Sequence, residues 1–209
     1  MELTNKIRIY NEDCLDALKK MPDNAFELAI VDPPYGLGNK LVDGNASRNS
    51  KIRYNRDSIK WDIVPNQEYF NELFRVSKNQ IIWGGNYFNL PPTRCNLIWD
   101  KMQIFTGADF ELAWTSFDKA SRAFRMSRIE AYSNGKIHPT QKPIKLYEWI
   151  LDNYANEDDK ILDTHLGSGS IALACHNMSY DLTAYEIDQE YFEATTKRIK
   201  DHIAQLTIF

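Results

Sequence analysis

Hydrophobic and polar positions along the chain fall into short patterns that predict alternating strands and helices. Residues 6–10 alternate apolar and charged side chains, as a half-buried strand does, and residues 26–31 form a continuous apolar run typical of a buried strand. Residues 14–21, between these two runs, favour a short helix. This part of the chain therefore predicts a strand–helix–strand unit.

The same alternation continues through the rest of the chain. We expect further strands at residues 80–83, 95–99, 110–117, 160–162 and 182–185, and helices at 67–76, 143–154, 170–178 and 189–205. Residues 36–60 predict a long loop, and residues 118–137 show no clear periodicity. Strands that alternate with helices favour an α/β fold with a mostly parallel open sheet and helices on both faces, here within a single domain, 1–209.

Composition is that of an ordinary globular protein, with 43% hydrophobic and 26% charged residues. No apolar run approaches the roughly 20 residues that span a bilayer, and the first residues lack the apolar core of a signal peptide, so we expect no membrane association and a cytoplasmic location in a bacterial cell. The cysteines, Cys14, Cys95 and Cys175, form no Cys-x-x-Cys pair, which predicts neither a disulfide framework nor a metal site.

Charge is distributed unevenly, although the formal net charge is only -4. Basic residues concentrate in residues 48–60 and again in residues 119–136, on an otherwise acidic chain. Most charge runs are simply solvated surface, but phosphate contacts require Lys and Arg. The candidate DNA contacts are Arg48, Lys51, Arg53, Arg56, Arg122, Arg125 and Arg128.

Ligands of such sheets bind beyond the carboxyl ends of the strands, which directs attention to residues 32–38 and 163–170. The first segment begins Asp32-Pro33-Pro34-Tyr35. Two prolines stiffen the backbone and remove two N–H donors, leaving carbonyls free to accept hydrogen bonds. Asp32 supplies another acceptor and Tyr35 a flat ring, a combination that suits a planar base with an exocyclic amino group.

The amino nitrogen of adenine is a poor nucleophile because its lone pair is delocalised into the ring. Hydrogen bonds from its two N–H groups to Asp32 and a proline carbonyl would favour a tetrahedral nitrogen whose lone pair faces an electrophilic methyl group. Stacking of the extracted base on Tyr35 would contribute about 1–3 kcal/mol. Taken alone, however, the four residues favour an ordinary Pro-Pro turn capped by Asp32.

The second segment joins Asp163 through a glycine turn, Gly167-Ser168-Gly169, to the start of a helix. Such a turn lets a ligand approach the backbone closely, and Asp163 is placed to hold a ligand ammonium group. Glu186 ends the next predicted strand, where an acid can accept hydrogen bonds from a ribose diol. The pattern indicates an adenosine-bearing cofactor, and by itself it equally fits an NAD-dependent oxidoreductase or a purely structural turn.

Together these motifs resemble the amino-methyltransferases of DNA. The resemblance rests on residues 11–14, the Asp32 to Gly36 segment, residues 83–88, residues 137–143, the glycine turn, and residues 186–188 with Tyr191. It implies a Rossmann-like fold, S-adenosylmethionine as cofactor, and double-stranded DNA as substrate. Catalysis is then expected from Asp32, Pro33, Pro34 and Tyr35, and cofactor binding from Asp13, Lys142, Asp163, His165, Gly167, Ser168, Gly169 and Glu186.

The motif order resembles the circularly permuted beta class, with a catalytic half (1–117) before a cofactor half (138–209). Asp32 implies adenine N6 over cytosine N4, since enzymes of the cytosine type more often carry Ser there. Thr164-His165 departs from the Pro-Phe usual in the family, and His138 is expected to be structural. Because residues 118–137 leave little room for target recognition, we expect short, degenerate or absent sequence specificity.

The chain ends in residues 205–209, Gln205 to Phe209, which resemble the peptide that docks bacterial proteins on the sliding clamp. The more favoured interpretation is that this end packs on the core, and a homodimer is also left open. Alternative functions are methylation of a cytosine amine, RNA or a protein glutamine, and a catalytically silent DNA-binding module. A restriction partner, a phage product and a solitary regulator all fit the sequence.

Overall fold

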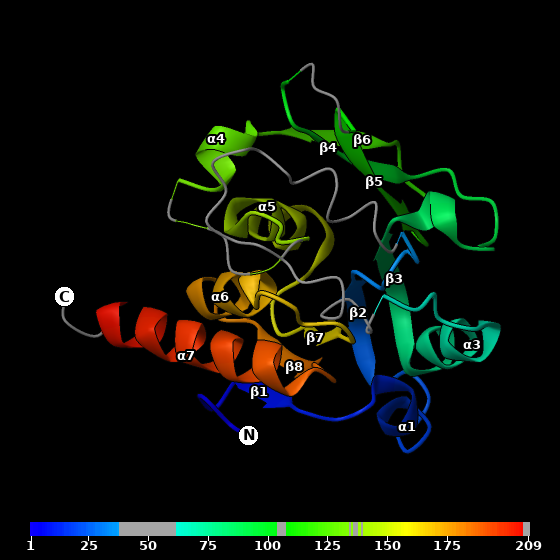
Figure 1. The fold of residues 1–209 in the computed structure, drawn as a ribbon. Coiled ribbons are helices and arrows are strands. Elements are labelled where there is room, and N and C mark those ends of the chain that lie inside the picture. The colour runs from blue at the N-terminus through cyan, green and yellow to red at the C-terminus, as the bar shows by residue number, and fades with distance from the viewer. Residues whose placement is uncertain (38–61, 104–107, 134, 136–137, 139, 207–209) are drawn as a thin grey trace.

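The structure is a computed structural model that describes residues 1–37, 62–103, 108–133, 135, 138 and 140–206. Its centre is an eight-stranded sheet with the order β1-β8-β7-β2-β3-β5-β4-β6 (Figure 1). The strands are β1 (Ile7–Tyr10), β2 (Phe26–Val31), β3 (Ser77–Trp83), β4 (Asn96–Asp100), β5 (Phe110–Thr115), β6 (Arg122–Arg125), β7 (Lys160–Asp163) and β8 (Asp181–Tyr185). The α-helices are α1 (Cys14–Leu18), α3 (Gln67–Val76), α4 (Arg128–Ala131), α5 (Ile144–Tyr154), α6 (Ser170–Asn177) and α7 (Gln189–Leu206), and η2 (Gly85–Tyr87) is a 3-10 turn.

The sheet is mostly parallel, as the sequence predicts. Strands β1, β8, β7, β2 and β3 pair in parallel, whereas β5 runs antiparallel to both β3 and β4. Because β5 is antiparallel to both neighbours, β4 runs in the same direction as β3. Strand β4 and its parallel neighbour β6 therefore run the same way as β2. The carboxyl ends of all strands except β5 therefore meet at one edge of the sheet.

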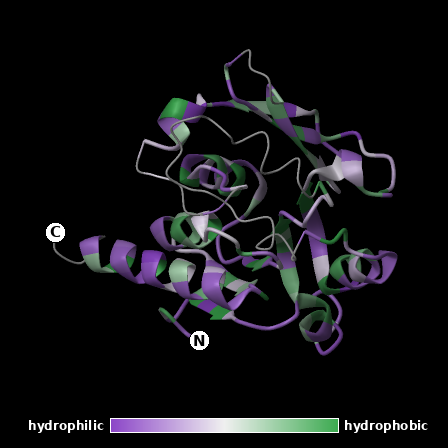
Figure 2. Ribbon diagram, viewed as in Figure 1, coloured by the Kyte–Doolittle hydropathy of each residue, from purple (hydrophilic) through white to green (hydrophobic). Residues whose placement is uncertain are grey.

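Helices cover both faces of the sheet, and each face has its own hydrophobic core. In β2, Leu28 and Ile30 pack on the side of α5, α6 and α7, while Ala29 and Val31 pack on the side of α1 and α3. Successive side chains of a strand point to opposite faces, so the continuous apolar run of β2 fills both cores at once. The strands are correspondingly rich in hydrophobic colour, whereas α7 is largely hydrophilic on its outer side (Figure 2).

The connections around β2 and β7 open a crevice between these two strands. From β2 the chain passes through α3 to β3 on one side, and from β7 it passes through α6 to β8 on the other. Since α3 and α6 lie on opposite faces, the two connections diverge at the carboxyl ends of β2 and β7 (Figure 1). Such a switch point is where open α/β sheets bind ligands, and both predicted ligand segments begin there.

Several boundaries and one segment differ from the sequence prediction. Strand β3 starts at Ser77, three residues earlier than expected, and α1 ends at Leu18. Residues 118–137, whose sequence shows no clear periodicity, contain β6 and the short helix α4. Strand β6 escapes detection because its Arg-Ala-Phe-Arg sequence is mostly exposed and has no apolar alternation, and it pairs through its backbone at the sheet edge.

Two sequence predictions lie at least partly outside the described residues. One is the loop predicted at residues 36–60, of which residues 38–60 are not described. The candidate DNA contacts in that loop are Arg48, Lys51, Arg53 and Arg56. The other is the proposed clamp-docking peptide: α7 includes Gln205, but residues 207–209 are not described. None of the helices in the described ranges is long and apolar enough to cross a membrane.

The glycine turn before α6 gives a test of how tightly the helical layer packs. Gly169 has a φ of 72°, and a Cβ atom there would lie 2.5 Å from Thr195 Cγ2 of α7. Gly135 also has a positive φ, 93°, but no described atom within 4 Å of such a Cβ. We expect Gly135→Ala to cost about 1–2 kcal/mol for the backbone alone, and Gly169→Ala about 1–3 kcal/mol more, measured by urea denaturation. Equal costs would contradict this account of the packing.

Candidate active site

A cavity of about 470 Å³ opens at the switch point of the sheet. Its walls come from segments that follow four neighbouring strands: β1, β2, β7 and β8. Those segments contribute Glu12, Asp13, Cys14, Leu15, Asp32, Pro34, Thr164, His165, Gly167, Glu186, Ile187 and Tyr191, and the remaining lining residues are Ile63, Val64, Pro65, Asn66, Tyr69 and His138. Both predicted motifs, separated by more than half of the chain, therefore face one cavity.

Asp32 and Pro34 form one wall of the cavity, directly after the buried strand β2, and Tyr35 contacts Asp32 beside them. The Tyr35 hydroxyl donates a hydrogen bond to Asp32 Oδ1 at 2.5 Å, and its ring stacks on Tyr87 with centroids 4.9 Å apart. Gly84 makes this position available, because a Cβ atom on it would lie 2.2 Å from the Tyr35 ring. Burial, reinforced by Asp32, raises the pKa of Tyr35 well above its ordinary value, so the phenol keeps its proton as a donor.

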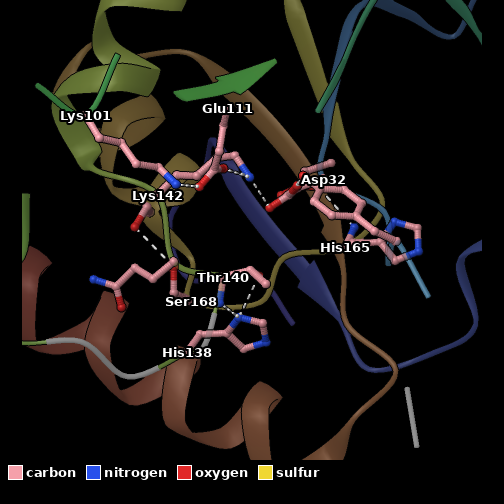
Figure 3. A network of polar contacts seen from close by, with 12 residues as sticks. Asp32, Lys101, Glu111, His138, Thr140, Lys142, His165 and Ser168 are labelled. Atoms are coloured by element: carbon pink, nitrogen blue, oxygen red, sulfur yellow. Dashed lines mark hydrogen bonds and ion pairs between the residues drawn. The ribbon is translucent and has the colours of Figure 1, made fainter. Parts of the chain in front are cut away.

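Behind Asp32 lies a network of charged side chains (Figure 3). Lys142 Nζ lies 2.5 Å from Asp32 Oδ2 and 3.3 Å from Glu111 Oε2, and Lys101 Nζ lies 2.9 Å from Glu111 Oε1. The Lys142 side chain is only 1% exposed, and its ammonium group sits 5.0 Å from the centroid of the Trp83 ring. The sequence assigned Lys142 to the cofactor, but the structure places it on Asp32, away from the lining of the cavity.

Electrostatics in this network follow from burial and alternating charge. Burial raises the pKa of Asp32 and the Glu111 carboxylate adds to that effect, whereas Lys142 and the Tyr35 hydroxyl act in the opposite direction. Burial also acts to raise the pKa of Glu111, but its two lysine neighbours outweigh burial and hold that pKa below its ordinary value. Despite burial, its two carboxylate neighbours raise the pKa of Lys142, which therefore stays charged at neutral pH.

The glycine turn and Glu186 form the opposite wall. Glu186 Oε2 accepts a hydrogen bond from the Gly167 backbone N–H at 2.8 Å, and Oε1 accepts one from Asp188 N–H at 3.0 Å. The Thr195 hydroxyl donates to the Gly167 carbonyl, which ties the turn to α7. Glu186 and Gly167 line the cavity, whereas Ser168 and Gly169 are behind the turn: Ser168 contacts Ser170, and Gly169 precedes α6.

Asp163 is a nearly fully buried carboxyl group at the end of β7, only 3% exposed. Its Oδ1 accepts a hydrogen bond from the His165 backbone N–H at 3.0 Å. Burial raises the pKa of Asp163 to about 8, Asp32 and Glu186 contribute to the rise, and the His165 N–H and Lys142 oppose it. The group is thus mostly protonated at neutral pH until a cation approaches it.

A chain of hydrogen bonds lines the floor of the cavity. The Tyr69 hydroxyl lies 2.6 Å from Thr164 Oγ1, which lies 2.9 Å from His165 Nδ1, and His165 Nε2 lies 3.9 Å from Cys14 Sγ. Burial lowers the pKa of His165 to about 4, so the imidazole is neutral. His165 thus lines the cavity and is held in place by a hydrogen bond.

Asp13 and His138 complete the cavity. Asp13 caps α1, its Oδ1 accepting hydrogen bonds from the backbone N–H groups of Leu15 and Asp16. His138 packs its ring edge-on to Tyr191, with centroids 4.4 Å apart, and its Nδ1 lies 3.1 Å from Thr140 Oγ1. Neither histidine near the cavity is part of a metal site, since the described residues contain no group of three or more His, Cys, Asp or Glu arranged to hold a metal ion.

The basic residues of the central segment lie on and after the edge strand β6. Arg122 and Arg125 begin and end this strand, three positions apart, so their exposed side chains point to opposite faces. Arg125 lies at the carboxyl edge of the sheet, the edge on which Asp32 also lies, with its Nε 3.3 Å from Asp100 Oδ2. Arg128 is half-buried and starts α4.

Four residues of the site are not among the candidate site residues of the sequence. Tyr69 lies on the buried face of α3 and is indistinguishable by spacing from a core aromatic residue. Lys101 and Glu111 flank the turn between β4 and β5, where charge is ordinary, and Tyr87 follows the glycine pair. Their proximity to Asp32 or the cavity depends on sheet order, which sequence periodicity does not supply.

Comparison with known families decides among the interpretations of this cavity. The model of a family described as DNA methylase, whose name specifies N6 and N4 methyltransferases, matches residues 65–197, more than half of the chain. The chain belongs to this DNA methylase family. The chain is accordingly a DNA amino-methyltransferase, in agreement with the resemblance of the sequence motifs.

Individual relatives are distant in sequence but cover most of this DNA methylase. The type II methyltransferase M.HpaI of Haemophilus parainfluenzae is 24% identical over 92% of the chain and 74% of the relative. M2.DpnII of Streptococcus pneumoniae is 22% identical over 94% of the chain and 90% of the relative. Both are named as type II methyltransferases.

Solved structures share the fold. A complex of M1.HpyAVI with S-adenosylmethionine has a TM-score of 0.58 and 21% identity, over 91% of this chain and 98% of that one. The cytosine-N4-specific PvuII DNA methyltransferase has a TM-score of 0.60 and 15% identity, over 94% and 91%. The doubly covered, mostly parallel sheet is thus that of known DNA methyltransferases, and the predicted fold class is confirmed.

Proposed function

We propose that this DNA methylase transfers a methyl group from S-adenosylmethionine to the 6-amino group of adenine in double-stranded DNA. The observation that carries the proposal is the position of the Asp32 carboxylate. Asp32 directly follows β2, is held by Lys142, and faces the same cavity as the glycine turn and Glu186. One wall suits an amino group, and the other suits the adenosine and amino-acid parts of the cofactor. Family membership favours methyl transfer over the oxidoreductase that the glycine turn alone left open.

The residues of the second wall fit S-adenosylmethionine. Glu186, oriented by two backbone N–H groups, has carboxylate oxygens available for a ribose diol, and Gly167 allows close approach to its backbone. Asp163 does not itself line the cavity, but it directly precedes the lining residues Thr164 and His165, and a ligand ammonium group beside it would ionise this buried acid. M1.HpyAVI and a modification methylase of Thermus thermophilus, both similar in fold, are named as complexes with this cofactor. When bound, the cofactor supplies an electrophilic methyl group.

Residues of the first wall would prepare the acceptor. Asp32 Oδ1 and the Pro33 carbonyl would each accept one N–H of the amino group, which draws its lone pair out of conjugation and toward the methyl group. Because the amino group of a paired base lies inside the duplex, the base must leave the helix to reach Asp32. Tyr35 and Tyr87, already stacked on each other, offer aromatic surface for the extracted ring.

Cytosine N4 is the alternative acceptor. It is favoured by the similarity in fold to the cytosine-specific PvuII enzyme, and both amino groups need the same two hydrogen-bond acceptors. Adenine is favoured by Asp32, because cytosine-type enzymes more often have Ser at that position. RNA and protein glutamine are less favoured, since the family is one of DNA methylases.

The proposal predicts that duplex DNA incubated with the protein and S-adenosylmethionine, then digested to nucleosides, contains N6-methyladenine by mass spectrometry. Asp32→Ala should lower turnover by roughly 10²–10³, the usual effect of losing one preorganised transition-state contact, while calorimetry shows cofactor binding retained. N4-methylcytosine without methyladenine would refute the choice of acceptor. Full activity of the Asp32 variant would refute its role.

Asp163 predicts a pH dependence of cofactor binding. Its pKa of about 8 means that a cation binding next to it at pH 7 must displace a proton. We therefore expect proton release on binding at pH 7, and an affinity that rises with pH and levels off above about 8, since the ionised form then prevails without ligand. Calorimetry in buffers of different ionisation enthalpy measures the release, and Asp163→Asn should abolish it. Undiminished release in that variant would exclude Asp163 as its source.

The position of β6 predicts unequal contributions of its arginines to DNA binding. Arg125 lies on the edge of the sheet that carries Asp32, whereas Arg122 begins the strand at the opposite edge. We expect Arg125→Gln to weaken binding and to reduce the slope of log affinity against log salt by about one, as loss of one phosphate contact does. Arg122→Gln is the matched control and should change the slope less. Equal slopes in both variants and the wild type would argue against β6 as a phosphate contact.

A further inference from the structure

Lys142 is a buried lysine whose charge the chemistry of methyl transfer does not itself require. Moving an ammonium group out of water costs several kcal/mol, and only close partners offset that cost. Lys142 has two such partners, Asp32 and Glu111, and lies over the ring of Trp83, which is fully buried. A hydrophobic residue would fill the same space without this cost, so the charge calls for an explanation.

The four charged groups form an array of alternating sign, Lys101–Glu111–Lys142–Asp32 (Figure 3). They come from three separate parts of the fold: the β4–β5 hairpin, the segment before α5, and the end of β2. Glu111 lies between two lysines and Lys142 between two carboxylates. If Lys142 moved away, both carboxylates would lose a partner, so its Nζ atom is held in place from two sides.

The two oxygens of Asp32 have partners of different kinds. Oδ2 is bound by Lys142, which is nearly inaccessible and held by Glu111. Oδ1 is bound by the hydroxyl of Tyr35, a neutral group that donates a single hydrogen bond. An amino group also donates one hydrogen bond to each acceptor, so it can exchange with the Tyr35 hydroxyl without any change in charge, whereas exchange with Lys142 would strand a buried ion.

We propose that Lys142 is a positioning residue of the methylation reaction, which fixes Asp32 through Oδ2 and keeps it ionised, so that Oδ1 alone is presented to the target amino group in exchange for the Tyr35 hydroxyl. The inference rests on the proposed function, in which Asp32 accepts a hydrogen bond from that amino group. Lys142 touches neither base nor cofactor in this role. It acts through the charge and the orientation of Asp32.

The surroundings of Asp32 make this role measurable. The titratable groups that face it or act on it are Tyr35 on its own segment, Glu111 on β5, Lys142 before α5, Tyr147 on α5, Asp163 on β7 and Tyr69 on α3. Glu111 raises the pKa of Asp32 and Lys142 lowers it. Neutralising these two neighbours of one carboxyl group should therefore shift its titration in opposite directions, which loss of packing alone would not do.

The test is to follow the titration of Asp32 by ¹³C NMR of its carboxyl carbon, assigned with Asp32→Asn, together with the acidic limb of the kcat profile. We expect Lys142→Met to raise the midpoint by about one pH unit or more, and to lower kcat about 10²-fold with the KM for the cofactor unchanged. Glu111→Gln should lower the midpoint, and Lys142→Arg should restore most of kcat. Lys78→Met, which removes an exposed lysine paired with Glu27 on β2, is the matched control and should change neither quantity.

An Asp32 midpoint that stays in place in Lys142→Met, or that moves in the same direction in both charge variants, overturns the proposal. If Lys142→Met does not fold, the test rests on Glu111→Gln alone. An Asp32 midpoint that does not fall in that variant overturns the proposal. The NMR titration needs no turnover and no DNA. Absence of methylation by the wild-type protein would thus refute the proposed function, whereas an unmoved midpoint refutes the role of Lys142, so the two failures are distinguishable.

Discussion

The buried ion pair between Asp32 and Lys142 is the interaction on which the rest of the site depends. A carboxylate and an ammonium group with so little access to water are tolerated only when each satisfies the other, so the surrounding elements must hold them together. Strand β2 fixes one partner, and the segment leading into α5 fixes the other. Packing of α5 against the sheet is thereby linked to the geometry around Asp32.

Topology explains why two distant motifs share one cavity. The connections that leave β2 and β7 run to opposite faces and diverge, which leaves the carboxyl ends of both strands open. The apolar run of β2 serves both cores, so the segment that follows it, Asp32 to Tyr35, is carried by a strand that is packed on both faces. Such a rigid support suits a site in which small displacements of an acceptor atom would weaken electrostatic preorganisation.

Much of this arrangement is predictable from the sequence because the relevant signals are local. Apolar runs and apolar–polar alternation predict all strands of the sheet except β6. The Pro-Pro and glycine motifs identify both walls of the cavity. The array behind Asp32 is not predictable in this way. Glu111 reaches Lys142 only because β5 is inserted antiparallel between β3 and β4, and no periodicity specifies that order. For the same reason, the motif containing Lys142 indicated the cofactor rather than Asp32.

The bond between Asp32 and Lys142 joins residues 110 positions apart, one from each half of the chain. The first half of the chain therefore carries a carboxyl group whose counter-ion belongs to the second half. Burial in the folded chain raises the pKa of Asp32, and Lys142, from the second half, opposes that rise. A charged carboxylate can therefore be kept away from water at this position only when both halves of the chain are packed together, which couples burial of Asp32 to completion of the sheet and its helices.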